Sequence, residues 1–194
     1  MATANGLPDA EGMTRDETLA LARRLGTLNT LVTVDIEAGF STDPGEVADL
    51  VAQLAEWGVV GINIEDGRGD HLADPEQQSA LVKAVRDRVP GIFINARADN
   101  YWLGIDQSVP AVLDRARHYT DAGADGIFVP RLAEPGEIAA VTEAVPLPIN
   151  VLYVKELGLR RLGELGVHRV STGSLLFRTA MRTAVDLALD VRRT

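Results

Sequence analysis

Several acidic side chains stand at the ends of short apolar runs, where together they could bind a metal ion. Asp35 and Glu37 lie at the end of the run 31–36, and Glu65 follows the run 59–64. Strand alternation would point Asp35 and Glu37 to one side, and three ionised carboxylates together need a compensating cation. Oxygen donors of this kind favour Mg²⁺ or Mn²⁺, which keep several waters. The alternative is that these acids cap helices or pair with arginines.

A candidate anion-binding group follows the run 91–96. Arg97 stands there, within Asn95-Ala96-Arg97-Ala98-Asp99. A guanidinium can hold a carboxylate or phosphate through two parallel hydrogen bonds. Arg97 could instead be a buried ion-pair partner of Glu65 or Asp99, and the two roles are compatible. The segment 171–174, Ser-Thr-Gly-Ser, could likewise form an anion cradle or simply cap the helix that follows it.

Composition excludes several classes of protein. The 194 residues contain no cysteine, which removes disulfides, Cys-ligated zinc and thiol chemistry. The formal net charge of −9 disfavours nucleic acid and anionic membranes as partners. No stretch resembles a signal peptide or a membrane helix, so we expect a cytoplasmic protein. The three histidines share no metal-ligand spacing.

The elements that must position these residues alternate regularly along the chain. Longer amphipathic segments separate six short apolar runs, which we interpret as buried parallel strands. Asp43-Pro44 and Asp74-Pro75 are typical of helix starts. Glycine closes three helices immediately before a strand, which indicates a repeated βα unit. The predicted strands are 31–36, 59–64, 91–96, 126–129, 148–152 and 167–171.

Two folds are compatible with a repeated βα unit. An open doubly wound sheet usually carries a glycine-rich phosphate loop after its first strand, and the segment 37–41 does not match one. Polar residues follow all six predicted strands, which favours a (β/α)8 TIM barrel. We therefore expect one domain, residues 1–194, with a TIM-barrel type of fold. Six recognisable units leave that barrel incomplete at its N-terminus.

The sequence resembles the isocitrate lyase/phosphoenolpyruvate mutase family over nearly its whole length. The matching segments follow the family's order: 6–9 (GLPD), 14–17 (TRDE), 34–40 (VDIEAGF), 61–66 (GINIED), 95–99 (NARAD), 122–130 (AGADGIFVP), 148–151 (PINV) and 166–174 (GVHRVSTGS). The resemblance implies a (β/α)8 barrel whose members cleave or form C–C or P–C bonds beside an α-oxo acid, through a Mg²⁺-stabilised enolpyruvate.

The resemblance also assigns roles to individual residues. Asp35 matches the direct metal ligand, and Glu37, Glu65 and Asp9 match acids that hold the waters of the metal. Arg97 matches the substrate-binding arginine, and Asn150 matches a polar contact to the far end of the substrate. The expected catalytic residues are therefore Asp9, Glu65 and Arg97.

Two departures from the family pattern stand out. The family's C–C lyases carry a Lys-Arg-Cys-Gly-His loop after the Glu65 strand, whereas the segment 66–72 reads DGRGDHL, without Cys or Lys. This disfavours cleavage of isocitrate or methylisocitrate by that route. In the family, the segment 6–9 follows two complete strands that this sequence lacks. About 50 further residues upstream, of the order of two βα units, would complete the barrel.

These observations predict a Mg²⁺- or Mn²⁺-dependent lyase or mutase-like enzyme. The expected partner is a small α-oxo or 2-hydroxy carboxylate, and the resemblance suggests a homo-oligomer that exchanges its C-terminal helix. The alternative is a non-catalytic remnant, a truncated barrel that lacks the cradle for the substrate carboxylate. The missing strands, which would leave two sheet edges exposed, favour the remnant, whereas six intact strand-end motifs oppose it.

Overall fold

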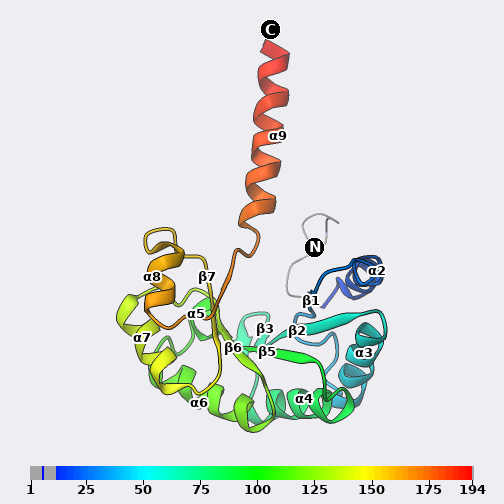
Figure 1. The fold of residues 1–194 in the computed structure, drawn as a ribbon, viewed down its shortest axis with the longest axis vertical. Coiled ribbons are helices and arrows are strands. Elements are labelled where there is room, and N and C mark those ends of the chain that lie inside the picture. The colour runs from blue at the N-terminus through cyan, green and yellow to red at the C-terminus, as the bar shows by residue number, and fades with distance from the viewer. Residues whose placement is uncertain (1–5, 7–11, 194) are drawn as a thin grey trace.

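The computed structural model describes residue 6 and residues 12–193, and a parallel sheet that curls into part of a barrel forms its centre (Figure 1). Strands adjacent in the sheet are also successive along the βα repeat, as in a TIM barrel. The order in the sheet is β1 (Val32–Asp35), β2 (Val59–Glu65), β5 (Phe93–Arg97), β6 (Gly126–Val129), β7 (Ile149–Leu152) and β8 (Arg169–Ser171). All six predicted strands are confirmed, with small shifts at their ends.

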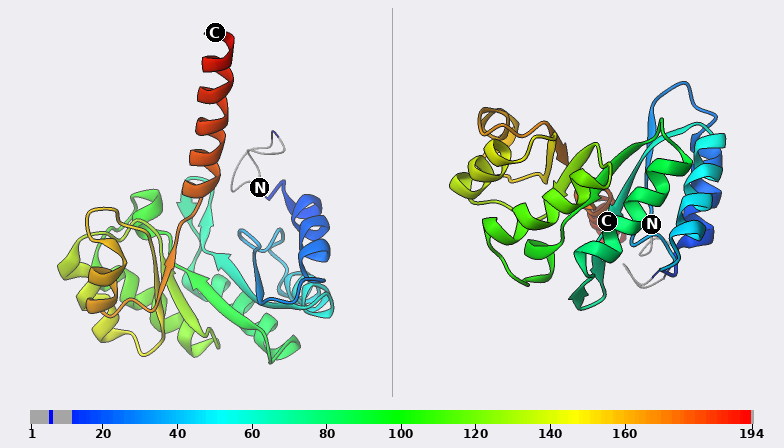
Figure 2. Two further views of the ribbon diagram at one scale, coloured as in Figure 1. Left: turned by 45° about the horizontal axis from the view of Figure 1, so that its top comes forward. Right: turned by 90° about the horizontal axis from the view of Figure 1, so that it is seen from below.

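Helices cover the outer face of the curled sheet (Figure 2). Apolar strand residues such as Ile64, Ile94 and Val151 are fully buried on that side, whereas Thr33 and Asp35 on the inner face are exposed. The helices are α2 (Arg15–Leu25), α3 (Pro44–Glu56), α4 (Pro75–Arg88), α5 (Asn100–Leu103), α6 (Val109–Asp121), α7 (Pro135–Ala144), α8 (Gly158–Glu164) and α9 (Leu175–Arg193). The main core therefore lies between the sheet and the helices.

The predicted helix starts are confirmed in atomic detail. Asp43 Oδ1 accepts hydrogen bonds from the backbone N–H of Gly45 at 2.7 Å and of Glu46 at 3.1 Å, at the start of α3. Asp74 Oδ1 accepts from Glu76 N at 2.8 Å at the start of α4. Both acids satisfy N–H groups that the first helical turn leaves without a partner.

The three predicted helix-to-strand glycines adopt the left-handed conformation. Gly58, Gly123 and Gly166 have φ values of 90°, 100° and 85°, and they close α3, α6 and α8 before the following strand. Glycine populates this region without the steric cost that a Cβ imposes. The βα unit is therefore repeated in the structure with the same joint.

A small hairpin that the sequence did not predict follows β2. Its strands β3 (Gly67–Arg68) and β4 (His71–Leu72) pair antiparallel, with Gly67 opposite Leu72. Two-residue strands are too short to produce a periodic pattern in the sequence. The hairpin lies within the segment 66–72, where the sequence departs from the pattern of the family that it resembles.

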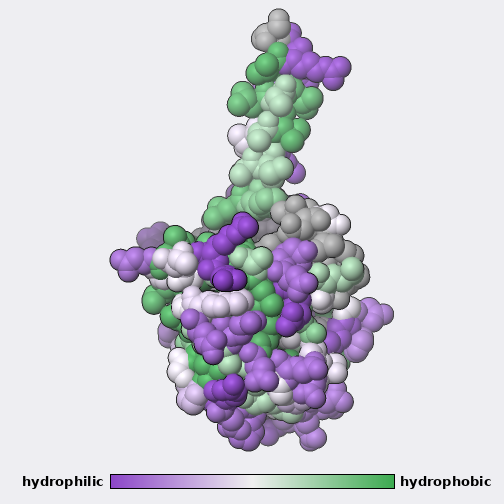
Figure 3. Space-filling view, turned by 90° about the vertical axis from the view of Figure 1, so that its right-hand side faces the viewer, coloured by the Kyte–Doolittle hydropathy of each residue, from purple (hydrophilic) through white to green (hydrophobic). Residues whose placement is uncertain are grey.

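The last helix projects away from the rest of the chain. Helix α9 contains no buried residue, and apolar side chains run along it above a more hydrophilic body (Figure 3).

The sheet has two open edges among the described residues, because β1 pairs only with β2 and β8 pairs only with β7. None of the helices within residues 12–193 is both long enough and apolar enough to cross a membrane.

Candidate functional site

The register of the sheet places the predicted site residues on one face. Glu65 of β2 is aligned with Arg97 of β5, Arg97 with Phe128 of β6, and Phe128 with Asn150 of β7. Aligned residues of a pleated sheet point to the same face, and alternation puts Ile64 and other apolar neighbours on the helix-covered side. The inner face at the carboxyl ends of the strands therefore carries the polar groups.

Arg97 is held in place by two buried carboxylates. Its Nη1 lies 2.6 Å from Glu65 Oε2, and its Nε donates to Asp99 Oδ1 at 2.5 Å. The Arg97 side chain is 13% exposed, and those of Glu65 and Asp99 are 5% and 2% exposed. The predicted alternative, an ion pair with Glu65 or Asp99, is confirmed for both acids. These contacts leave Nη2 without an acceptor among the described residues.

Aromatic rings fix the guanidinium from its sides. The Cζ of Arg97 lies 5.2 Å from the ring centre of Trp102 and 5.7 Å from that of Phe128. A second guanidinium, that of Arg131, also stacks on Trp102, with its Cζ 4.4 Å from the ring centre. Arg131 Nη1 donates a hydrogen bond to the Trp102 carbonyl at 3.1 Å. Cation–π contacts of this kind orient a guanidinium in its plane. The ring of Trp102 therefore contacts two guanidinium groups, those of Arg97 and Arg131.

Burial and neighbouring charges shift the pKa values of the acids that contact Arg97. Burial raises the pKa of Glu65 to about 8, against the opposing charge of Arg97, and Asp99, Asp35 and Glu37 raise it further. Burial likewise raises the pKa of Asp99 to about 6, although Arg97 opposes the shift. Burial lowers the pKa of Arg97, but the carboxylates of Asp99 and Glu65 outweigh it and raise the pKa overall. Burial is therefore the main cause of both raised carboxyl pKa values, and the neighbouring acids add to it.

A row of amide side chains supports Asp35. Asn95 Nδ2 donates to Asn63 Oδ1 at 2.9 Å, and Asn63 Nδ2 donates to Asp35 Oδ2 at 3.4 Å. These residues are aligned on β5, β2 and β1. The Asp35 carboxylate also accepts the backbone N–H of Glu37 at 3.0 Å. Asp35 is thus oriented at the end of its strand while its side chain remains accessible.

Glu37 does not follow the strand alternation that the sequence suggested. Strand β1 ends at Asp35, and Glu37 has a φ of 49°, in the left-handed region. Its carboxylate accepts hydrogen bonds from Gly12 N, at 2.8 Å, and from the Thr14 hydroxyl. A turn therefore sets the direction of Glu37, and Glu37 connects the site to the segment before α2. A non-glycine residue in this conformation is strained, as is common near functional sites.

The remaining predicted site positions are Asn150, Asp9 and the segment 171–174. Asn150 is buried on the inner face, and both atoms of its side-chain amide lack a hydrogen-bond partner among the described residues. Asp9 lies outside the described residues. The segment 171–174 makes a local turn, in which Ser171 Oγ accepts from Gly173 N at 3.4 Å.

The donor set fits a hydrated divalent cation rather than a closed cage of ligands. Within residues 12–193, no three His, Asp or Glu side chains converge to bind one ion directly. Mg²⁺ commonly binds through one or two carboxylates and fills its other positions with water. Asp35, with Glu37 and Glu65 near enough to influence one another electrostatically, matches that pattern. A cation here would relieve the mutual repulsion of the carboxylates.

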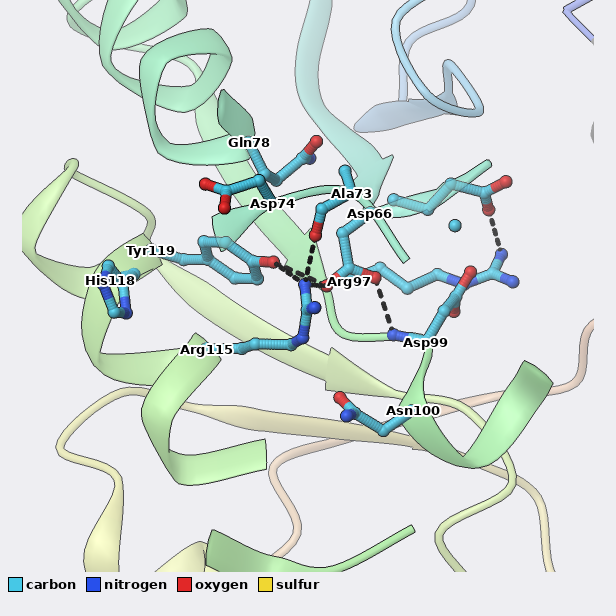
Figure 4. A network of polar contacts seen from close by, with 12 residues as sticks. Asp66, Ala73, Asp74, Gln78, Arg97, Asp99, Asn100, Arg115, His118 and Tyr119 are labelled. Carbon is cyan, nitrogen blue, oxygen red and sulfur yellow. Dashed lines mark hydrogen bonds and ion pairs between the residues drawn. The ribbon is translucent and has the colours of Figure 1, made fainter. Parts of the chain in front are cut away.

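Sequence reasoning missed a buried network behind Arg97, in which Asp66 is the central residue (Figure 4). Asp66 is fully buried; its Oδ2 accepts from Tyr119 OH at 2.5 Å and from Arg115 Nη1 at 2.8 Å. Its Oδ1 accepts the backbone N–H of Asp99 at 2.8 Å. The sequence feature that could have indicated this network is Arg115, a charged residue that lies one helical turn before Tyr119 on α6.

The β3–β4 hairpin is tied down by Arg68. Arg68 Nη1 donates to the carbonyls of Glu65 and Gly67, at 2.8 and 2.9 Å, and Nη2 donates to Gln78 Oε1 at 2.8 Å. His71 is exposed and contacts Asp70. The hairpin thus contributes a structural arginine, and it contains neither cysteine nor lysine.

Comparisons with known proteins agree with this architecture. A family model described as phosphoenolpyruvate phosphomutase matches residues 1–192. A Mycobacterium tuberculosis protein that is itself described only as uncharacterized is 43% identical over 191 residues, covering 98% of this chain and 73% of that protein. The 2-methylisocitrate lyase of Salmonella typhimurium is 30% identical over 156 residues, covering 74% of this chain and 52% of the lyase.

A solved structure confirms the barrel type of fold. The crystal structure of a phosphonopyruvate hydrolase in complex with oxalate and Mg²⁺ superposes with a TM-score of 0.86 at 22% identity, covering 99% of this chain and 71% of that one. The curled parallel sheet is therefore TIM-barrel-like. Because the family model extends over almost the whole sequence, the chain belongs to the phosphoenolpyruvate phosphomutase family, in the superfamily that includes the isocitrate lyases.

Proposed function

We propose that the protein is a Mg²⁺- or Mn²⁺-dependent lyase or mutase-like enzyme for a small α-oxo or 2-hydroxy carboxylate. The reaction would break or form a C–C or P–C bond through an enolpyruvate-type intermediate. The observation that carries the proposal is Arg97, a buried guanidinium at the carboxyl ends of parallel strands, which contacts Glu65 and Asp99 and donates no hydrogen bond from Nη2 to a described residue. Functional residues of TIM barrels lie at this end.

The proposed metal site uses Asp35 as the direct ligand. Glu37 and Glu65 would hold waters of the ion, and Asp9, outside the described residues, is proposed for the same role. When bound, the ion supplies electrostatic stabilisation to negative charge that develops on a substrate oxygen. The phosphonopyruvate hydrolase of the same fold was solved with oxalate and Mg²⁺, which supports Mg²⁺ as the ion to test.

Arg97 and Asn150 would bind the substrate. The open Nη2 of Arg97 can donate to a substrate carboxylate while Glu65 and Asp99 keep the guanidinium in plane. Asn150 offers an amide donor and acceptor that no described residue uses, which suits the polar far end of a small acid. Trp102 and Phe128 shield the guanidinium from water, which strengthens its interaction with an anion.

The β3–β4 hairpin restricts the reaction. In place of the cysteine and lysine of the family's catalytic loop, it presents Gly67, Arg68 and His71. We therefore do not assign isocitrate or methylisocitrate cleavage by the cysteine route to this chain. Oxaloacetate, alkylmalates and phosphonopyruvate remain the substrates to test.

We also propose that the protein is a homo-oligomer. Eight large apolar side chains of α9 are between 45% and 68% exposed, which is more apolar surface than one isolated helix of a monomer usually presents. A second copy of the chain is the partner that we propose for this helix.

A second candidate, a non-catalytic barrel remnant, is favoured by the two sheet edges. Strands β1 and β8 each have one unpaired side among the described residues, and inner-face residues such as Thr33 and Phe93 are exposed. If the purified protein shows no cooperative melting and no shift with Mg²⁺ plus oxalate, this candidate is correct.

Turnover of oxaloacetate, alkylmalates and phosphonopyruvate with Mg²⁺, repeated after EDTA, tests the enzyme proposal. We expect activity on at least one substrate that EDTA abolishes and that Asp35→Ala lowers by several orders of magnitude. Activity that is indifferent to both EDTA and Asp35→Ala would contradict the proposal. Asp49→Ala, at an exposed acid on α3, serves as the control.

A further inference from the structure

The buried network around Asp66 connects helix α6 to the guanidinium of Arg97 (Figure 4). Arg115 Nη1 and Tyr119 OH both donate to Asp66 Oδ2, at 2.8 and 2.5 Å. Asp66 Oδ1 accepts from Asp99 N at 2.8 Å, and Asp99 Oδ1 accepts from Arg97 Nε at 2.5 Å. An unbroken series of hydrogen bonds therefore runs from α6 to the proposed substrate-binding group.

The network also fixes the backbone around the site. Asp66 N donates to the Arg97 carbonyl at 3.2 Å, and Ala73 N donates to the Asp66 carbonyl at 2.8 Å. Arg115 Nη1 reaches the Ala73 carbonyl as well, at 2.9 Å. The turns after β2 and β5 are thus joined to each other and to the segment before α4. A shift of Asp66 would move Asp99, and with it the partner that orients Arg97.

The geometry leaves Asp99 little freedom. A Cβ placed on Gly67 would lie 2.5 Å from Asp99 Oδ2, so the Asp99 carboxylate packs directly against the glycine. Asp66 has no exposed surface, and the Arg115 side chain is 12% exposed. Arg115 forms an ion pair with Asp66, whereas Arg97 is shared between Asp99 and Glu65. Buried carboxylates without such partners are costly.

From this geometry we propose that Arg115 and Tyr119 are positioning residues for substrate binding. They act on Arg97 through Asp66 and Asp99, and neither contacts the substrate. The inference rests on the proposed role of Arg97 in binding a carboxylate. Ion-pair networks that serve only stability also occur in protein interiors, so the test must separate stability from positioning.

The test uses Tyr119→Phe, which removes only the hydroxyl, and Arg115→Lys, which keeps the charge. Thr120→Val is the matched control, because Thr120 is on the same helix and, among the described residues, its hydroxyl donates only to the Ala116 carbonyl, at 2.7 Å. The Nε–Hε signal of Arg97, followed by NMR in ligand-free protein labelled with ¹⁵N-arginine, reports the bond to Asp99. Calorimetry then gives the affinity for oxalate in the presence of Mg²⁺.

We expect Tyr119→Phe to shift the Arg97 signal and to weaken oxalate binding by up to about fivefold, because about 1 kcal/mol is the usual contribution of one such hydrogen bond and sets the upper limit of its indirect effect on Arg97. Arg115→Lys should cause a smaller change, because a lysine can still reach an acceptor. Thr120→Val should change neither quantity. In an Arg97→Lys background, Tyr119→Phe should have little further effect on oxalate affinity, since coupled residues are not additive.

An unchanged Arg97 signal and unchanged affinity in Tyr119→Phe, with only the melting temperature lowered, would overturn the proposal. An additive double-mutant cycle would overturn it as well. If the wild type binds no oxalate, the proposed function fails, and the ligand-free spectra still decide whether α6 positions Arg97.

Discussion

Arg97 is the residue on which the candidate site depends. It combines two buried ion pairs with two aromatic contacts, and its Nη2 donates no hydrogen bond to a described residue. A lysine could not bind Glu65 and Asp99 at once in the plane that the guanidinium uses. The identity of this side chain, rather than its charge alone, therefore determines the geometry.

We predict that Arg97→Lys weakens oxalate binding in the presence of Mg²⁺ by about tenfold or more, because the planar fork is lost. Calorimetry measures this directly. Arg88→Lys is the control, since Arg88 forms an exposed pair with Asp49 at 3.2 Å. Equal affinities for wild type and Arg97→Lys would show that Arg97 does not bind the ligand.

A second residue-scale prediction concerns Gly67. Gly67→Ala should lower the free energy of unfolding by about 1–3 kcal/mol, the usual cost of overpacking, because the new Cβ meets Asp99 Oδ2. Urea unfolding gives the value. Gly91→Ala, where the added Cβ has no atom within 4 Å, should change stability much less. Similar losses at both positions would contradict the close packing of Asp99.

For individual residues, the sequence indicates which side chains stand at strand ends, but it does not indicate which side chains form hydrogen bonds or ion pairs with one another. Asp35, Glu65 and Arg97 could be located because each ends an apolar run. The Asp66 network could not, because Arg115 and Tyr119 are 49 and 53 residues away from Asp66 along the chain. Strand alternation predicts that the Glu37 side chain points to the same side as that of Asp35, but β1 ends at Asp35, two residues before Glu37.

The elements were more predictable than the contacts between residues. All six strands, the two Asp-Pro helix starts and the three glycine joints follow from local chemistry and occur as predicted. The β3–β4 hairpin does not, since its strands are only two residues each. Its position depends on tertiary contacts of Arg68 with carbonyls and with Gln78.

We predict that Asp74→Ala lowers the free energy of unfolding by about 1 kcal/mol, because two backbone N–H groups at the start of α4 lose their acceptor. Chemical denaturation measures the change. Asp70→Ala, at an exposed loop acid, should stay within about 0.5 kcal/mol of the wild type. Equal effects at the two positions would show that the cap contributes nothing.

At the scale of the whole molecule, helix α9 is the feature on which the proposed homo-oligomer depends. Phe177, Met181 and Val185 lie on one side of it at 46–53% exposure. The spacing of four residues places them on one face. We therefore expect a second copy of the chain to cover this face.

Met181→Glu should shift the protein towards monomer, because a charge would then be buried in the interface. Size-exclusion chromatography with light scattering gives the mass. Thr179→Glu, on the polar side of the same helix, should leave the mass unchanged. A wild type that is monomeric at micromolar concentration would contradict the proposed homo-oligomer.

The central claim is that the acidic inner face binds a divalent cation together with a small carboxylate. Isothermal titration of oxalate into the wild type and into Asp35→Asn, each with Mg²⁺ and with EDTA, tests it most directly. We predict that the wild type binds oxalate only in the presence of Mg²⁺, and that Asp35→Asn weakens this binding by about tenfold or more. Oxalate binding of equal strength in EDTA, or unaffected by Asp35→Asn, would contradict the claim.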